Sequence, residues 1–238
     1  GFAYTLNNLI FTVTIPNRRL DIEPNVNDIA EEIVRLYGYH NLTATLPVVS
    51  IKKGEYKGDI KYRKYISKRL RMKGLTETKT YTLVSPDMAE LFCYDKKEKL
   101  VLPNPMSVDK SVVRTTIIPS LINVYNYNKA RKVEDIFLYE ISKTYDKNYQ
   151  EESKIAGLLK GNIVKSSWNG NIKCDFYVVK GIVEDILNSL GFTNRYTFIP
   201  AKLPNLHPGV SASILLDGEM LGIMGRVHPN TLKDEVYI

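Results

Sequence analysis

Cysteine, tryptophan and histidine are scarce in this chain of 238 residues, which has two, one and three of them respectively. The two cysteines, Cys93 and Cys174, lie far apart and lack the spacing of a metal-binding motif, so we expect reduced thiols in a cytoplasmic protein. No run approaches the roughly 20 apolar residues that cross a membrane. The first residues also lack the basic region and the cleavage site of a signal peptide. These absences predict a soluble protein without a disulfide framework.

Negative charge is also in short supply, because 33 lysines and arginines face 26 acids. The resulting net charge of +7 and isoelectric point near 9.2 favour an anionic partner, of which nucleic acid is the most common. The same charge also serves solubility in a protein of this length. Charge by itself leaves both interpretations open.

The first part of the chain predicts a small α/β module over residues 1–47. The segment 9–16 is rich in β-branched residues and ends at a proline, which is typical of a strand. From residue 28 to 37 the apolar side chains recur at helical spacing, and Gly38 follows as a stop signal. Residues 48–58 contain two glycines and a lysine-rich stretch, so we expect a linker there.

The rest of the chain, residues 59–238, predicts an α+β domain with an antiparallel sheet flanked by helices. Strands that are mostly joined by turns, with helices grouped between them, favour this fold class over an alternating α/β fold. The expected elements are helices at 59–73, after Pro86 and after Pro119, strands at 77–84 and 135–146, and a hairpin turned at Asp217-Gly218.

Four carboxylates gather around the start of the first helix. Asp28, Glu31 and Glu32 stand at i, i+3 and i+4, on one helical face, and Asp21 precedes them in a loop. Such a cluster predicts a Mg²⁺ site, because hard cations take oxygen ligands. The competing interpretation is helix capping, since acids in a first turn offset the helix dipole. Spacing alone favours capping.

Six segments, in order, resemble the β chain of bacterial phenylalanyl-tRNA synthetase. They are RRLDI with DIAEEIVRLYGYHNL, KGLTETKTYTLVSP, LPNPMSVDKSVVRTTIIPSLINVYNYNKAR, DIFLYEISKTYD, LHPGVSASILLDG and GIMGRVHPNTL. The resemblance runs from the first residues to the last, but it covers only the middle-to-late part of that family's chain. The absence of an initiator methionine and the apolar end fit an excised part of a longer protein.

The resemblance implies a winged-helix-like, metal-binding module at 1–47 and a catalytically silent domain of class II synthetase fold at 59–238. In the family, two α and two β chains form an enzyme that attaches phenylalanine to tRNA-Phe with ATP, and the α chain holds the active site. The implied role of this chain is therefore a scaffold that packs on the catalytic α subunit. We expect low to moderate direct contact with tRNA, on the interpretation that lysine and arginine are spread along the chain rather than clustered.

A class II active site needs one arginine on its second motif and another on a Gly-rich helix to neutralise the phosphates of ATP. This sequence shows no counterpart of the second arginine. Arg114 and Arg131 flank the helix of the second motif's counterpart, but no Gly-x-Gly-x-x-Arg run follows it. His207 and His228 each precede a proline in loop-like contexts, where we expect turn residues rather than acid/base groups. We therefore expect no catalytic or nucleotide-binding residues in this chain, with ATP used only by the intact complex.

The resemblance also implies a Mg²⁺ site formed by Asp21, Asp28, Glu31 and Glu32 and completed by the α chain. The loop before Asp28 is one residue longer than the family pattern, so either the loop absorbs the extra residue or Asp21 moves out of reach and Asn27 becomes the nearer ligand. Two rival functions are a stand-alone winged-helix nucleic-acid-binding protein and an active class II ligase. The acidic helix weakens the first, because its carboxylates would repel phosphates.

Overall fold

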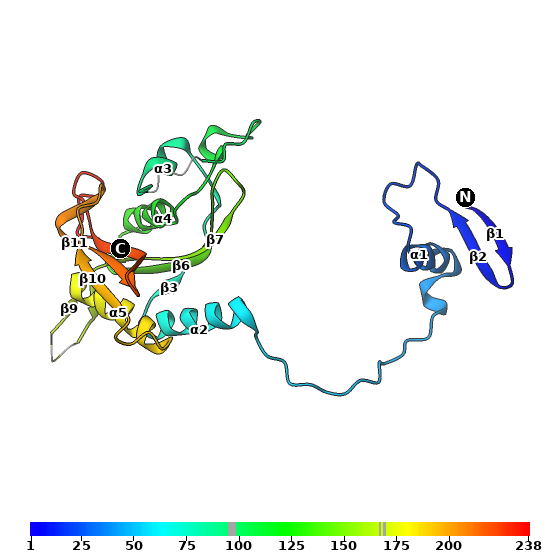
Figure 1. The fold of residues 1–238 in the computed structure, drawn as a ribbon, viewed down its shortest axis with the longest axis horizontal. Helices are drawn as coiled ribbons and strands as arrows, with labels where there is room; N and C mark the ends of the chain where they lie inside the picture. The colour runs from blue at the N-terminus through cyan, green and yellow to red at the C-terminus, as the bar shows by residue number, and fades with distance from the viewer. Residues whose placement is uncertain (95–98, 167, 169) are drawn as a thin grey trace. The chain divides into compact units, whose positions relative to one another are not determined.

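The structure, a computed structural model, describes residues 1–94, 99–166, 168 and 170–238. It divides into two compact units, Gly1–Gly54 and Glu55–Ile238 (Figure 1). The division falls inside the connection that the sequence predicts at 48–58, and the residues from 43 to 57 form no helix or strand. Across the described parts of the chain, each helix is too short or too polar to span a membrane.

The first unit is a β-hairpin followed by one α-helix and a short 3₁₀ turn. Strands β1 (Ala3–Asn7) and β2 (Ile10–Thr14) pair antiparallel and are joined at Asn8 and Leu9, whose φ angles of 44° and 65° are left-handed. Helix α1 (Val26–Tyr37) ends at Gly38, where a φ of 99° lets the chain turn into η1 (Tyr39–Asn41). None of residues 1–54, all of which the structure describes, is fully buried.

The second unit is mixed α+β, as the sequence predicts. Its larger helices are α2 (Gly58–Met72), α4 (Ile118–Ala130) and α5 (Phe176–Ser189). Its smaller elements are β4 (Leu83–Val84), α3 (Pro86–Glu90), η2 (Val108–Lys110), β5 (Val112–Val113), β8 (Asn162–Val164) and β9 (Ile172–Lys173).

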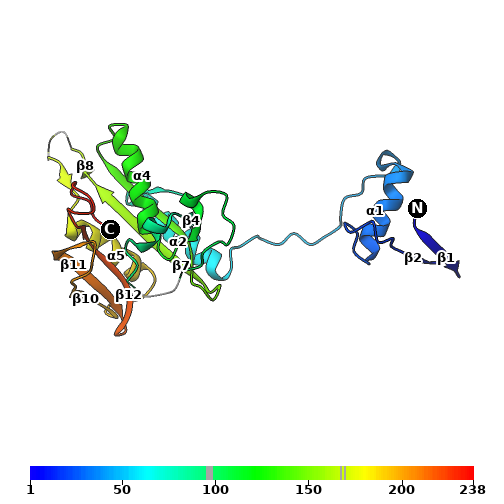
Figure 2. The same ribbon diagram turned by 90° about the horizontal axis from the view of Figure 1, so that it is seen from above.

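Two three-stranded sheets make the centre of this unit. One has the order β3 (Thr76–Glu77), β6 (Ile136–Tyr145), β7 (Glu151–Lys160). The other has the order β10 (Tyr196–Pro200), β11 (Leu206–Leu216), β12 (Glu219–Val227) (Figure 2). All pairs are antiparallel except β3–β6, which corrects the expectation of a wholly antiparallel sheet. The long crossover through α3 and α4 between those strands permits the parallel pairing.

The last three residues join the two sheets into one. Tyr237 exchanges both backbone hydrogen bonds with Leu159 of β7, at 2.8 and 2.9 Å. On its other side, Ile238 exchanges both bonds with Gly225 of β12, at 2.9 and 3.0 Å. A continuous sheet therefore runs from β3 through residues 236–238 to β10.

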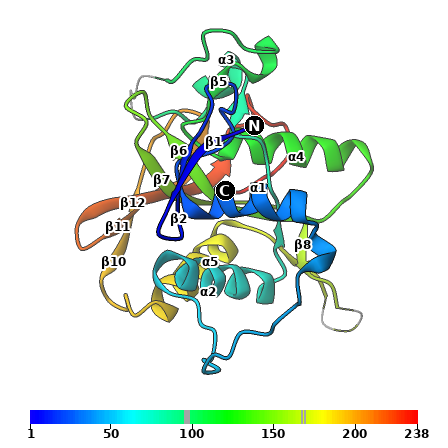
Figure 3. The same ribbon diagram turned by 90° about the vertical axis from the view of Figure 1, so that its right-hand side faces the viewer.

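Helices cover both faces of this sheet (Figures 1 and 3). Alternate residues of β6 point to opposite sides, so Leu138 joins the cluster that contains Leu121 of α4, whereas Ile141 joins the cluster that contains Leu70 of α2 and Val179 of α5. The result is a three-layer arrangement with two buried apolar clusters, one on each side of the sheet.

The strand expected over 77–84 forms only at its two ends. Its first residue, Glu77, is the end of β3, and its last two residues form β4, which pairs with β5 in a separate two-stranded sheet. Between them, the Thr80 hydroxyl donates a hydrogen bond to Glu140 of β6 at 2.7 Å. The prediction of a single strand over 77–84 is therefore wrong between its two ends, because the chain leaves one sheet for another there.

Candidate functional site

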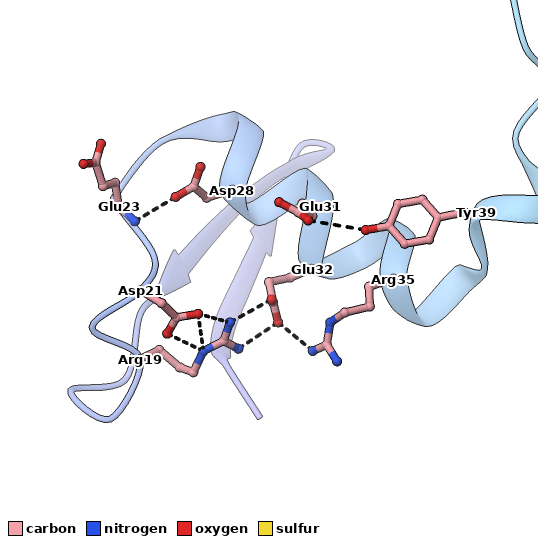
Figure 4. Close-up of polar contacts among 8 residues, drawn as sticks. All are labelled: Arg19, Asp21, Glu23, Asp28, Glu31, Glu32, Arg35 and Tyr39. Carbon is pink, nitrogen blue, oxygen red and sulfur yellow. Dashed lines mark hydrogen bonds and ion pairs between the residues drawn. The ribbon is translucent and has the colours of Figure 1, made fainter. Parts of the chain in front are cut away.

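Arg19 lies at the centre of the acidic cluster in the first unit (Figure 4). It follows β2 in a loop, and its Nε and Nη2 donate hydrogen bonds to Asp21 at 2.9 and 2.7 Å. The same guanidinium donates from Nη1 and Nη2 to Glu32 of α1, at 2.9 and 2.8 Å. Both contacts are of the bidentate kind that suits a planar guanidinium. Arg19 therefore joins the loop to the helix by bridging two of the four predicted ligands.

The carboxylates beside Arg19 are strongly biased toward the charged form. Hydrogen bonds from Arg19 lower the pKa of Asp21 to about 2. Hydrogen bonds from Arg19, and then from Arg35 one turn further along α1, lower the pKa of Glu32 to about 2. Arg19 and Arg35 of the same chain therefore already compensate the negative charge of Asp21 and Glu32.

The other two predicted ligands have separate roles. Asp28 accepts the backbone N–H of Glu23 at 2.9 Å, and its own N–H donates to the Asn25 side chain, also at 2.9 Å. Asn25 is therefore the N-cap of α1, so the capping pattern begins three residues earlier than the Asp28–Glu31 pair suggests. Within the described part of the chain, Glu31 accepts only a long hydrogen bond of 3.4 Å, from the Tyr39 hydroxyl.

In the arrangement of Figure 4 the four carboxylates do not converge on one point. Among the described residues there is no group of three acids, histidines or cysteines placed to hold a metal ion. Asp21 and Glu32 are brought together around Arg19, whereas Asp28 and Glu31 point to other partners. The metal-binding role of Asp21, Asp28, Glu31 and Glu32 stays a prediction.

Arg114 in the second unit is turned inward, into contact with buried side chains. Its side chain is 1% exposed, and Nη2 donates to the fully buried Glu140 at 2.9 Å. Nη1 donates to the Thr80 hydroxyl at 2.7 Å, and that hydroxyl donates to the second oxygen of Glu140. The three side chains satisfy one another, as buried charges must. This arginine is therefore a structural residue of the sheet and does not present its charge to a phosphate.

Glu140 and Thr80 were not singled out from the sequence. The signal that could have found Glu140 is its place in β6, where apolar residues flank it on both sides in a strand whose two faces are both buried. A carboxylate at such a position needs a buried cation, and Arg114 is the arginine that meets it.

The remaining predicted residues take structural positions. Arg131 ends α4, where its guanidinium donates to the carbonyl of Tyr127 and lies over that ring. His207 and His228 accept backbone N–H groups two residues further on, at 3.2 and 3.1 Å, through Nδ1. His228 follows β12 and closes a turn, as expected, whereas His207 lies within strand β11, so the expectation of a turn residue is wrong there. The two rings stack with centroids 6.5 Å apart.

Solved structures share the fold of most of this chain. Two solved structures of pyrrolysyl-tRNA synthetase from Desulfitobacterium hafniense are similar to this chain. One matches with a TM-score of 0.54 over 74% of this chain and 60% of that chain, at 12% identity. The other has a TM-score of 0.55, covers 74% and 63%, and is 10% identical. This likeness shows the fold alone, which is that of a class II aminoacyl-tRNA synthetase.

Sequence comparison then gives the family. Residues 1–39 match the tRNA synthetase B5 domain, and residues 42–235 match the phenylalanyl tRNA synthetase beta chain CLM domain. Phenylalanine–tRNA ligase beta subunits of Geobacillus kaustophilus and Bacillus subtilis are 39% and 35% identical over the whole of this chain. The chain belongs to the family of phenylalanyl-tRNA synthetase beta chains. It spans 31% of the length of each of these two relatives.

Proposed function

We propose that this chain is a non-catalytic scaffold region of the β subunit of phenylalanine–tRNA ligase. In the intact enzyme it would pack on the catalytic α subunit, which charges tRNA-Phe with phenylalanine using ATP. The observation that carries this proposal is the match of both units, in order, to domains of one synthetase family. A stand-alone nucleic-acid-binding protein is not favoured, because the relatives from Geobacillus kaustophilus and Bacillus subtilis, which match the whole chain, are beta subunits of this ligase.

The inward position of Arg114 supports catalytic silence. An arginine that neutralises a phosphate must leave its guanidinium open to the ligand, whereas this one is enclosed with Glu140 and Thr80. We expect the chain alone to give no phenylalanine-dependent exchange of pyrophosphate into ATP. Exchange above background by the purified chain would contradict this part of the proposal.

We also propose that Asp21, Asp28, Glu31 and Glu32 bind Mg²⁺ in the complex, together with groups of the α subunit. Four carboxylates within one short segment support this proposal, since Mg²⁺ takes oxygen ligands. In the present arrangement Arg19 holds two of the four, so binding requires the guanidinium to leave them. The winged-helix-like character proposed for this unit is supported by its β-hairpin, β1–β2, and by its helix α1.

The experiment is size-exclusion co-elution of this chain with its catalytic α subunit, run in Mg²⁺ and in EDTA. We expect a complex in Mg²⁺ that weakens in EDTA. The variant Glu31→Gln should weaken the complex in Mg²⁺, because it removes one predicted ligand that has no cation partner among the residues that the structure describes. Glu23→Gln is the matched control, since it removes an exposed acid outside the predicted set.

The outcomes separate the two parts of the proposal. A complex that is equally stable in EDTA keeps the scaffold role and returns the carboxylates to capping and to their ion pairs with Arg19. Failure to co-elute in either condition contradicts the scaffold role for these two units.

A further inference from the structure

Arg19 occupies the place between Asp21 and Glu32 that a bound cation would take. Its Nε and Nη2 donate to the two oxygens of Asp21, at 2.9 and 2.7 Å (Figure 4). Its Nη1 and Nη2 donate to the two oxygens of Glu32, at 2.9 and 2.8 Å. Every oxygen of these two carboxylates therefore already accepts a hydrogen bond from one guanidinium.

The loop holds Arg19 in this position. The backbone N–H of Arg19 donates to the carbonyl of Pro16 at 2.9 Å, which closes a turn shortly after β2. The guanidinium carbon lies 5.8 Å from the centre of the Phe2 ring, next to the start of β1. These contacts, together with the two bidentate ion pairs, make Arg19 a fixed part of the unit and not a freely moving surface side chain.

The charges of this pair of acids are also balanced. Asp21 and Glu32 carry two negative charges, and Arg19 and Arg35 carry two positive ones, since Arg35 donates to Glu32 at 2.9 Å. A divalent cation is attracted by carboxylates that lack a partner, and a guanidinium a few ångströms away repels it. The pair therefore offers little net attraction to a metal ion.

The other two predicted ligands do not supply the missing attraction. Asp28 accepts the backbone N–H of Glu23, and Glu31 is directed toward the Tyr39 hydroxyl (Figure 4). To meet on one ion, Asp28 would have to give up its hydrogen bond while Asp21 and Glu32 gave up Arg19. The residues of this cluster, in the arrangement they adopt, do not fit a divalent cation.

We propose that Arg19 is the cation around which this cluster is organised, and that its guanidinium excludes divalent cations from the chain on its own. The unit then needs no metal ion to fold, because Arg19 already joins the loop to α1. This contact is autoinhibitory toward the Mg²⁺ binding proposed above, and that consequence rests on the proposed function.

The contact would also couple the metal to the partner. If Mg²⁺ binds only after Arg19 has left the carboxylates, a partner that binds the released guanidinium raises the affinity for Mg²⁺. By linkage, Mg²⁺ then raises the affinity for that partner by the same factor. The α subunit would accordingly have to offer Arg19 an acceptor.

The test is a titration of the chain with Mg²⁺, followed by the backbone amide NMR signals of residues 17–37. The unmodified chain should bind weakly. The variant Arg19→Gln should bind at least about tenfold more tightly, because it removes a positive charge that lies a few ångströms from the ion. Adding Glu31→Gln to that variant should reverse the gain, which would show that the ion is held by these carboxylates.

Two further variants separate charge from geometry. Arg18→Gln is the matched control, since Arg18 is an exposed neighbour for which the described residues provide no ion pair. It removes the same charge from the same loop and should change the affinity by less than about twofold, because solvent and salt screen exposed charges. Arg19→Lys keeps the charge without the planar fork, so its affinity should fall between those of the unmodified chain and Arg19→Gln. It also decides the question if Arg19→Gln does not fold.

Equal Mg²⁺ affinity in the unmodified chain and in Arg19→Gln, or equal gains from Arg18→Gln and Arg19→Gln, would overturn the proposal. Co-elution with the α subunit separates it from the proposed function. A gain from Arg19→Gln, with a complex that is indifferent to EDTA, would keep the role of Arg19 and contradict the shared metal. A complex that weakens in EDTA, with no gain from Arg19→Gln, would keep the shared metal and contradict the role of Arg19.

Discussion

Each of the two units contains an arginine that forms an ion pair with a glutamate, and the two pairs differ in their exposure to solvent. In the second unit Arg114 and Glu140 are 1% and 0% exposed, beneath helices that cover both faces of a sheet. In the first unit Arg19 and Glu32 are 26% and 16% exposed, and none of residues 1–54 is fully buried. The second unit is held by a core, whereas the first is held by caps, a hairpin and surface ion pairs.

The same kind of ion pair therefore contributes differently to stability at the surface and in the core. An exposed pair exchanges water for a partner at little net gain, because solvent screens both charges. A buried pair has lost its water completely, so each member depends on the other. The comparison predicts that equivalent changes in the two units will have very different consequences.

The largest effect is expected from Arg114→Met. Leaving Glu140 buried without its cation costs about 3–5 kcal/mol, which corresponds to a melting temperature lower by roughly 10 °C in a unit of this size. Differential scanning calorimetry measures the change. The double variant Arg114→Met/Glu140→Leu should recover much of the loss, because it removes the unpaired charge. A single variant as stable as the unmodified chain would contradict the account of this network.

A smaller effect is expected in the first unit from Arg19→Gln. Because Arg19 is the main cause of the lowered pKa of Asp21 and Glu32, both carboxyls should titrate nearer their ordinary values of 3.8 and 4.5, instead of about 2. Lowered values mean that these pairs stabilise the folded state above about pH 4 and lose that effect as pH falls toward 2. Carbon-13 NMR of the side-chain carboxyls measures the two pKa values. The NMR signals of α1, followed over the same pH range, measure the loss of the folded state.

Arg35→Gln is the control for that titration. Arg35 is the second cause of the lowered pKa of Glu32 and has no contact with Asp21. It should raise the pKa of Glu32 by less than Arg19→Gln does and leave Asp21 unchanged. Equal effects of the two variants would mean that the bridge from the loop to α1 does not form in solution.

The two units also differ in how much of them the sequence predicts. The helices at 59–73 and after Pro119 and the strand at 135–146 follow from periodicity, because a two-sided core imposes a clear apolar pattern. Periodicity says nothing about residues 236–238, since three residues are too few to show a pattern. These residues nevertheless join the two sheets. Their position depends on backbone partners in β7 and β12 that come together only in the folded unit.

The candidate site was predicted less completely, for a related reason. Helical spacing correctly places Asp28, Glu31 and Glu32 in α1, but it does not say which cation will compensate them. Arg19 stands two residues before Asp21 in the sequence, and the loop folds back so that its guanidinium meets Glu32. Long-range contacts made by loop residues depend on the loop's path, which no local pattern specifies.

The smallest effect is expected at the hairpin tip, from Leu9→Gly. Leu9 has a φ of 65° and is 92% exposed, so a side chain that gains nothing from burial is kept in a left-handed conformation. Glycine at this place in a two-residue turn should stabilise the hairpin by about 1 kcal/mol. Cross-strand NOEs between β1 and β2 measure the gain, and Asn8→Gly should give less, since asparagine tolerates positive φ. Because the first unit has no core to absorb a local change, the gain should extend to α1 and leave the melting of the second unit unaltered.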